Sequence, residues 1–229
     1  MIFTIIGIVF MLALFVFVYT RQPKGHRVSL LSCLIAGLLG AIPAFFISFY
    51  FQIFTSAFVL KYIENDTLRK IIEYFLVVAL SEELLKFISG VIVSKKTCTT
   101  RSNYITVFAA AGVGFDIFES SFQMGDGLSM IVRCVLAIHI SLQICMAGFY
   151  SKGHKVLALV VPIIIHGLYD FGLSDGLSGL FSSSAEDGVI LILVVALGGI
   201  AFLVWSMIFA NSVGKQDKAL LEKENKVEA

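Results

Sequence analysis

The sequence has few of the residues that interrupt helices or cross-link small domains. It contains three prolines and four cysteines in 229 residues. The cysteines form no CxxC pair, and three of them lie in strongly apolar stretches, where a free thiol behaves as a small hydrophobic group. We therefore expect neither a disulfide framework nor a zinc site built from thiolates.

Charge is scarce as well. Only 14% of the residues are charged, compared with about 25% in a typical soluble domain. The 17 Lys and Arg residues nearly balance the 16 Asp and Glu residues, which leaves a net charge of +1. A chain with this balance has no overall positive field to attract nucleic acid, so we expect no nucleic-acid partner.

Apolar residues are abundant instead. They make up 58% of the sequence, and the mean hydropathy is +0.94. A soluble protein of this size cannot hide so much apolar surface in its interior. The lipid bilayer is therefore the expected partner for most of the chain.

Seven segments approach the length of about 20 apolar residues that a membrane crossing requires. They lie near residues 2–19, 28–51, 71–93, 104–123, 128–150, 156–174 and 189–211. We predict an all-α, polytopic bundle of about seven transmembrane helices, with one transmembrane domain over residues 1–213 and a polar tail over 214–229. Pro43 lies inside the second segment, which we expect to be a tilted, kinked helix.

The charges of the connecting loops predict the orientation. With the N-terminus outside, the cytoplasmic loops and tail hold twelve basic residues and the outer loops hold three. Cytoplasmic loops carry an excess of Lys and Arg in membrane proteins. The N-terminus is therefore predicted outside and the tail in the cytoplasm.

Eight ionisable side chains fall deep inside the predicted spans, where each charge costs about 2.5–3.5 kcal/mol on insertion scales, whereas Arg133 lies nearer the outer end of its span and can reach the headgroups. With a rise of about 1.5 Å per residue, they lie at similar depths, from the middle of the membrane to its outer third. Four different spans contribute them, which predicts one buried polar site. The residues are Glu82, Glu83, Lys86, Asp116, Glu119, His139, His166 and Asp170.

The spacing within each helix supports this convergence. Lys86 can reach both Glu82 and Glu83, which precede it by four and three residues. The two glutamates point about 100° apart on a helix, so we expect one to face a cavity while the other braces a neighbouring helix. Any one of these residues alone is also compatible with a simple packing role.

Two chemistries suit such a cluster. A desolvated glutamate can take a proton from water while a histidine stabilises the oxyanion, which is the chemistry of peptide hydrolysis. Alternatively, two histidines and a carboxylate can hold zinc with an open coordination position. The HExxH motif is absent, so either site has to be assembled from separate helices.

The ordered motifs resemble those of the PrsW family of intramembrane proteases. The resemblance rests on Glu82-Glu83-x-x-Lys86, a G-x-G-F stretch that leads to Phe118-Glu119, the isolated His139 and His166-x-x-x-Asp170. It covers about residues 71–175, the expected catalytic core. The wider superfamily includes CAAX-prenyl endopeptidases and bacteriocin-immunity-type membrane proteins.

The resemblance implies a multi-pass protease of the bacterial cytoplasmic membrane. Such an enzyme makes the first cut in a single-pass membrane protein, such as an anti-sigma factor, near its extracytoplasmic side. The family motifs assign catalytic roles to five residues, namely Glu82, Glu83, Glu119, His139 and His166. We interpret Lys86, Asp116 and Asp170 as supporting residues, although Asp116 matches no position of the family motifs.

The cofactor remains open between two mechanisms. The family is grouped with metalloproteases, which favours a divalent metal such as zinc on His139, His166 and Glu119. Its prenyl-protease relatives use glutamate without metal, and we prefer a glutamate-activated water on that ground.

Two other functions compete with proteolysis. A proton- or ion-coupled transporter uses the same intramembrane Glu, His and Asp residues, although the sequence shows no inverted repeat. A catalytically silent binding or immunity protein of the same superfamily can use the fold to hold a partner helix.

Overall fold

A computed structural model describes residues 2–122, 137–173 and 185–228. All regular secondary structure within these ranges is helical, which confirms the all-α prediction. The helices are α1 (Ile2–Thr20), α2 (Leu30–Phe58), the 3₁₀ helix η1 (Leu60–Tyr62), α3 (Asp66–Ile71), the π-helix η2 (Ile72–Ala79), α4 (Leu80–Thr97), α5 (Arg101–Phe122), α7 (Ile138–Tyr150), α8 (Lys155–Leu173) and α10 (Ala185–Glu228).

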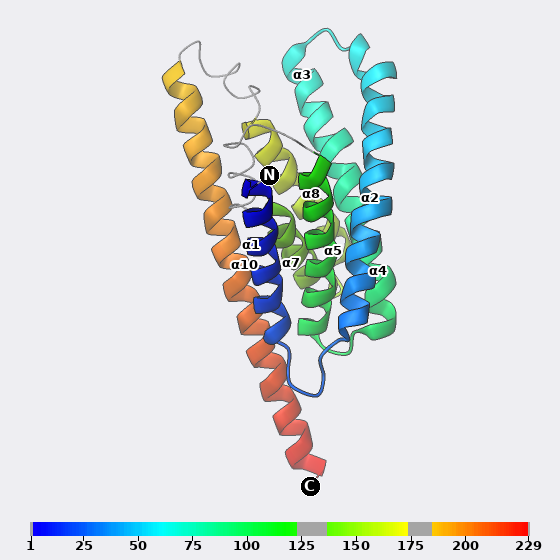
Figure 1. Cartoon of the computed structure of the whole chain (residues 1–229), viewed down its shortest axis with the longest axis vertical. Coiled ribbons are helices and arrows are strands. Elements are labelled where there is room, and N and C mark those ends of the chain that lie inside the picture. The colour runs from blue at the N-terminus through cyan, green and yellow to red at the C-terminus, as the bar shows by residue number, and fades with distance from the viewer. Residues whose placement is uncertain (1, 123–136, 174–184, 229) are drawn as a thin grey trace.

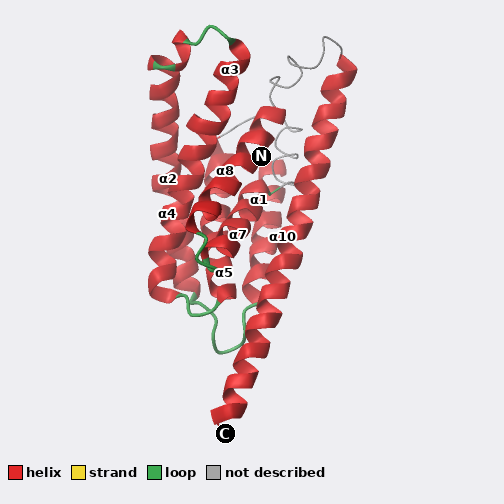
Figure 2. Cartoon of the chain, turned by 180° about the vertical axis from the view of Figure 1, so that it is seen from behind, coloured by secondary structure: helices red, strands yellow, loops and turns green. Residues whose placement is uncertain are grey.

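The helices stand side by side in an elongated bundle. Figure 1 places α10 along one edge and α2 with α3 and α4 along the other, and Figure 2 shows the same order from behind. Helix α7 lies between them, and its side chains from Ile138 to Gly148 are all buried. A helix surrounded in this way can present polar groups to the interior from any face.

The third predicted span is built from three helical segments. α3, η2 and α4 follow one another without a break, and the residues at both junctions, Ile72 and Leu80, keep right-handed helical angles. A π-helix has more residues per turn than an α-helix. The eight residues of η2 therefore set the rotation with which α4 presents Glu82 and Glu83.

Helix α2 packs closely against α5. It continues through Pro43 to Phe58, further than the predicted end at residue 51, and has 29 residues. A Cβ atom at Gly40 would collide with the backbone of Ala111, and one at Gly114 would collide with the backbone of Gly37. These glycines let the two backbones approach closely, as small residues do between membrane helices.

The outer surface has the character of a membrane protein. Three described helical stretches are long and apolar enough to cross a bilayer, namely Leu30–Tyr62, Lys155–Gly172 and Leu193–Val227. Ile5–Thr20 and Ile138–Tyr150 are shorter apolar helices. The beginning of the fifth predicted span, before residue 137, lies outside the described residues, so the count of seven crossings stays a prediction, as does the orientation.

The polar tail predicted over residues 214–229 is helical as far as Glu228. Residues 214–228 continue α10, which has 44 residues and extends beyond the other helices towards the C-terminus (Figure 1). Asp217 Oδ2 accepts a hydrogen bond of 2.7 Å from the backbone nitrogen of Ser102, in the first turn of α5. This contact fastens the extended part of α10 to the bundle.

The described cysteines are free. Cys33, Cys98 and Cys145 make no disulfide, while Cys134 lies outside the described residues. Burial raises the pKa of the Cys98 thiol, at the end of α4, to about 12. These three thiols therefore have a packing role rather than a cross-linking one.

Candidate active site

The eight ionisable side chains predicted to meet do converge. α4 contributes Glu82, Glu83 and Lys86, and the other five come from α5, α7 and α8. A chain of ion pairs and hydrogen bonds, none longer than 3.9 Å, links all of them. The four helices thus build one continuous polar cluster inside an otherwise apolar bundle.

Glu83 is the centre of this cluster. Its side chain is completely buried, and Oε1 lies 2.7 Å from Lys86 Nζ and 2.9 Å from His166 Nδ1. Oε2 accepts a hydrogen bond of 3.0 Å from Gln143 Nε2. Because protein groups occupy both oxygens, Glu83 joins α4 to α7 and α8 and does not face a substrate.

Glu82, unlike Glu83, faces open space. It lines a cavity, and its Oε2 lies 3.4 Å from Lys86 Nζ and 3.9 Å from His166 Nε2. Oε1 accepts a hydrogen bond of 3.2 Å from Gln52 Nε2 of α2. The two adjacent glutamates therefore divide as expected, with Glu82 towards the cavity and Glu83 as the brace.

His139 lies in the first turn of α7, two residues after Ala137. Ala137 has a φ of 39°, a left-handed conformation that costs a non-glycine residue about 1–2 kcal/mol. The imidazole Nδ1 lies 2.7 Å from Lys86 Nζ. Nε2 lies 3.1 Å from Glu119 Oε2 and 3.8 Å from Asp116 Oδ1, so this ring connects α4 with both acidic residues of α5.

His166 is held in a defined orientation. A carboxylate can only accept hydrogen bonds, so His166 Nδ1 is the donor in the contact with Glu83. Nε2 then points towards two carboxylates, 3.2 Å from Asp170 Oδ2 and 3.9 Å from Glu82 Oε2. A ring nitrogen placed between two acidic groups is suited to hold a proton or a cation.

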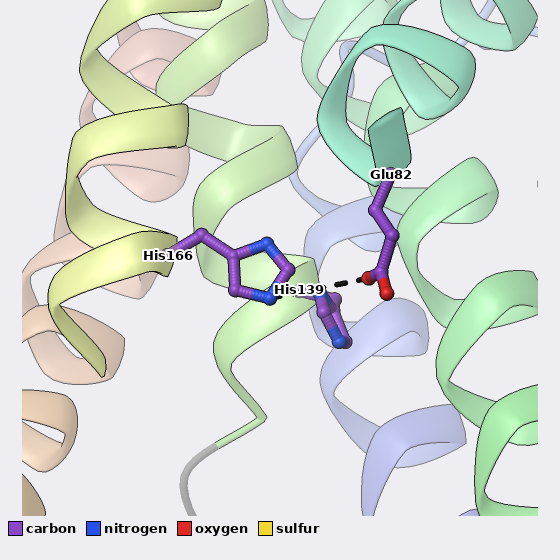
Figure 3. A group of neighbouring side chains, drawn as sticks. All are labelled: Glu82, His139 and His166. Carbon is purple, nitrogen blue, oxygen red and sulfur yellow. Dashed lines mark ion pairs between the residues drawn. The ribbon is translucent and has the colours of Figure 1, made fainter. Parts of the chain in front are cut away.

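The cluster opens into a cavity of about 340 Å³. Glu82, His139 and His166 come from three separate helices and point towards one another on its wall (Figure 3). The wall also contains Asp116, Glu119, Asp170 and Tyr169. Such a cavity gives a peptide bond and a water molecule room beside carboxylates and imidazoles.

Comparison with models of known families gives the family of the chain. A family model described as PrsW family intramembrane metalloprotease matches residues 25–204. The chain belongs to the PrsW family. Searches of the curated proteins and of the solved structures find no match. By its family, the chain is a membrane protease.

The donor atoms of this PrsW protein fit a divalent metal. Glu82, His139 and His166 each offer one ligand atom, and these atoms lie within 4.8 Å of one another. Five carboxyl groups share the cluster with one ammonium and two imidazoles, so acidic groups are in excess and a divalent cation would reduce that excess. His166 also has the outer carboxylate, Glu83, that typically orients a metal-binding histidine.

The grouping differs in one respect from the set expected from the sequence. Glu119 forms its own group with His139 and Asp116, while Glu82 is the carboxylate that joins both histidines. The two groups therefore have only His139 in common, and Glu119 does not belong to the group that contains His166. It remains on the wall of the same cavity.

Two amides that were not predicted from the sequence hold the glutamates. Gln143 is bonded to Glu83 and Gln52 to Glu82, and Gln52 also donates 2.9 Å to Ser48 Oγ, which in turn contacts Ser81. Both are polar residues within apolar runs, and Gln143 follows His139 by four residues, on the same helical face. That periodicity was the available signal. The site also extends beyond residues 71–175, because α1 and α2 contribute Met11 and Gln52 to its wall.

Proposed function

We propose that the protein is an intramembrane endopeptidase that hydrolyses a peptide bond within the cavity of Glu82, His139 and His166. The observation that carries the proposal is the division between the adjacent glutamates. Glu83 is committed to Lys86, His166 and Gln143, while Glu82 faces the cavity beside two imidazoles. A hydrolytic site needs a general base that faces the substrate and a second group that holds the catalytic residues in place, and Glu82 and Glu83 suit these two roles.

The residues of the chain supply the proton transfers. Glu82 accepts a proton from a water molecule in the cavity, and the neighbouring ammonium of Lys86 balances the charge of the carboxylate. His139 and His166 stabilise the developing oxyanion and deliver a proton to the leaving amine. Gln52 holds the orientation of Glu82 from α2.

A divalent metal, with zinc as the candidate, would be held by Glu82, His139 and His166. Such an ion supplies Lewis acidity towards a peptide carbonyl and a water molecule. In that arrangement Glu82 would be a ligand, and Asp116, Glu119 and Asp170 would be the other carboxylates on the cavity wall. Metal content and the effect of a chelator on cleavage therefore separate the two arrangements.

The substrate class is part of the proposal, and family membership is the reason for choosing it. We propose a single-pass membrane protein, such as an anti-sigma factor, cut near its extracytoplasmic side in the bacterial cytoplasmic membrane. The excess of basic residues in one set of loops supports an N-terminus outside and a C-terminus in the cytoplasm of a multi-pass protein with about seven crossings.

The decisive experiment is cleavage of a candidate single-pass substrate by the purified full-length chain in lipid vesicles. Glu82→Gln should abolish product formation while the protein remains folded. Glu64→Gln is the matched control, because Glu64 is exposed and does not line the cavity. Wild-type function in cells with Glu82→Gln would instead assign the fold to a non-catalytic binding protein.

A further inference from the structure

A second pocket, which shares no residue with the catalytic cavity, lies between the α1–α2 loop and the extended part of α10. It has a volume of about 450 Å³. We call it the basic pocket, because five cationic side chains line it, namely Arg21, Lys24, Arg27, Lys215 and Lys218. Figure 1 shows the loop between α1 and α2 beside α10 at this end of the bundle.

The basic pocket has a strong excess of positive charge. Glu222 is the only acidic residue on its wall, and it lies 3.8 Å from Lys218. Within the described part of the chain, Arg21, Lys24, Arg27 and Lys215 make no ion pair. Four cationic residues therefore line one small volume, and none of them pairs with a described carboxylate, which favours an anion there.

The wall of the pocket is rigidly built. Gln22, which is 2% exposed, accepts hydrogen bonds from Val28 N (2.9 Å) and Asn103 Nδ2 (2.6 Å). Asn103 also donates 2.9 Å to the carbonyl of His26. These bonds fix the shape of the loop on α5, so the loop presents its cations from a fixed backbone.

The opposite wall is fixed as well. Gly214 allows the carbonyl of Arg21 to approach α10 so closely that a Cβ atom would collide with it. Asp217 holds the same turn of α10 to the start of α5. The Arg21 guanidinium lies 4.2 Å from the centre of the Phe17 ring, which directs it along α1. Both walls are therefore held in place without a ligand.

The surface beside the pocket identifies the source of the anion. Within the two turns of α10 that precede Asn211, the first pocket residue on this helix, Trp205 and Ile208 are 46% and 63% exposed. Tryptophan favours the boundary between membrane and water. An acyl chain can lie on this apolar surface while its headgroup enters the pocket, whereas a soluble phosphate gains nothing from it.

We propose that the basic pocket binds the phosphate-bearing headgroup of an anionic phospholipid. The lipid joins α10 to the α1–α2 loop at the end of the bundle that is predicted to face the cytoplasm. This assignment is independent of the proteolytic function, because none of the residues involved lines the catalytic cavity.

The test is native mass spectrometry of the purified full-length chain with phosphatidylglycerol, phosphatidylcholine or inorganic phosphate. We expect wild-type protein to retain phosphatidylglycerol in preference to phosphatidylcholine. Arg21→Gln with Lys215→Gln should weaken phosphatidylglycerol binding about tenfold or more, as the loss of two adjacent cations implies. Lys24→Gln with Arg27→Gln should act in the same direction.

The matched control removes two other exposed lysines, Lys95 and Lys96, at the end of α4 and outside the basic pocket. Lys95→Gln with Lys96→Gln should leave phosphatidylglycerol retention unchanged. An equal loss of phosphatidylglycerol from this control would show that the lipid is held by general attraction to surface charge and not by the basic pocket. Displacement of the lipid by inorganic phosphate would overturn the choice of a lipid, and retention in both pocket variants would overturn the site itself.

Discussion

Gln143 donates a hydrogen bond of 3.0 Å to Glu83 Oε2, the oxygen that Lys86 and His166 leave free. Gln143 belongs to α7 and Glu83 to α4, so this bond joins the two central helices of the site. It completes the set of protein partners around Glu83. Gln143 thus helps to orient His166 through Glu83, although Gln143 does not line the cavity.

Replacement of Gln143 by alanine should therefore impair catalysis through Glu83. We expect a fall in cleavage rate of about 10–100-fold, the usual cost of losing a group that orients a catalytic or metal-binding residue. Ser141→Ala is the control, because Ser141 is buried on the same helix and bonds to Ala137 and Ser206 instead. Equal cleavage rates for the two variants would show that Gln143 does not support catalysis through Glu83.

The adjacent glutamates should respond differently to the same substitution. Glu82→Gln should stop cleavage and keep most of the stability, because the contact between Glu83 and Lys86 remains. Glu83→Gln should destabilise the protein by about 3–5 kcal/mol, since it removes the closest partner of a buried ammonium. Thermal unfolding, followed through the single tryptophan, Trp205, measures the difference. Equal destabilisation by both variants would contradict the division of roles.

The convergence of the charged residues was predictable because ionisable groups are costly in lipid. A helix that carries Glu82, Glu83 and Lys86 must bury them against other polar groups, and α5, α7 and α8 each carried candidates at the same depth. The helix type followed for the same reason, since a backbone in lipid has to satisfy its hydrogen bonds internally. Local physics thus sufficed for the fold class and for the membership of the cluster.

The division of roles within the cluster depended on tertiary structure. Which glutamate faces the cavity is set by the rotation of α4, which follows the π-helix η2, and no periodic pattern in residues 72–79 indicated that change of pitch. Gln52 was out of reach for another reason. It contacts Glu82 across the interface between α2 and α4, which no spacing in the sequence of α2 indicates.

Removal of a metal should separate the two arrangements of the site. If Glu82, His139 and His166 hold a metal, the chain should carry about one equivalent of divalent metal, and a strong chelator should slow cleavage until zinc is added back. His166→Ala should reduce the metal content more than Asp66→Asn, a control carboxylate on the exposed α3. Metal analysis by mass spectrometry measures both. Full activity in a metal-free, chelator-treated preparation would instead assign the hydrolysis to Glu82 acting directly on water.

The charges of Glu83 and Lys86 should be coupled energetically. Lys86→Met alone leaves Glu83 buried without its ammonium partner, although His139, His166 and Gln143 stay close to it, so it should destabilise the protein by about 3–5 kcal/mol. The double variant Glu83→Gln with Lys86→Met removes both charges. It should be more stable than the sum of the single effects predicts, by about 0.5–3 kcal/mol, while remaining inactive. Additive effects in thermal unfolding would contradict a direct ion pair.

The close approach of α2 and α5 gives a test of the fold that is independent of catalysis. Gly114→Ala places a methyl group against the backbone of Gly37, which neither a rotamer change nor a flexible side chain can relieve. We expect a loss of about 1–3 kcal/mol in thermal unfolding, as overpacking usually causes. Gly198→Ala on α10 is the matched control, because nothing lies within 4 Å of its added methyl group. That substitution should be neutral or stabilise the helix by up to about 1 kcal/mol. Since α2 carries Gln52, Gly114→Ala should also slow cleavage, whereas Gly198→Ala should not. A Gly114→Ala protein as stable and active as wild type would mean that α2 does not pack against α5 at this point.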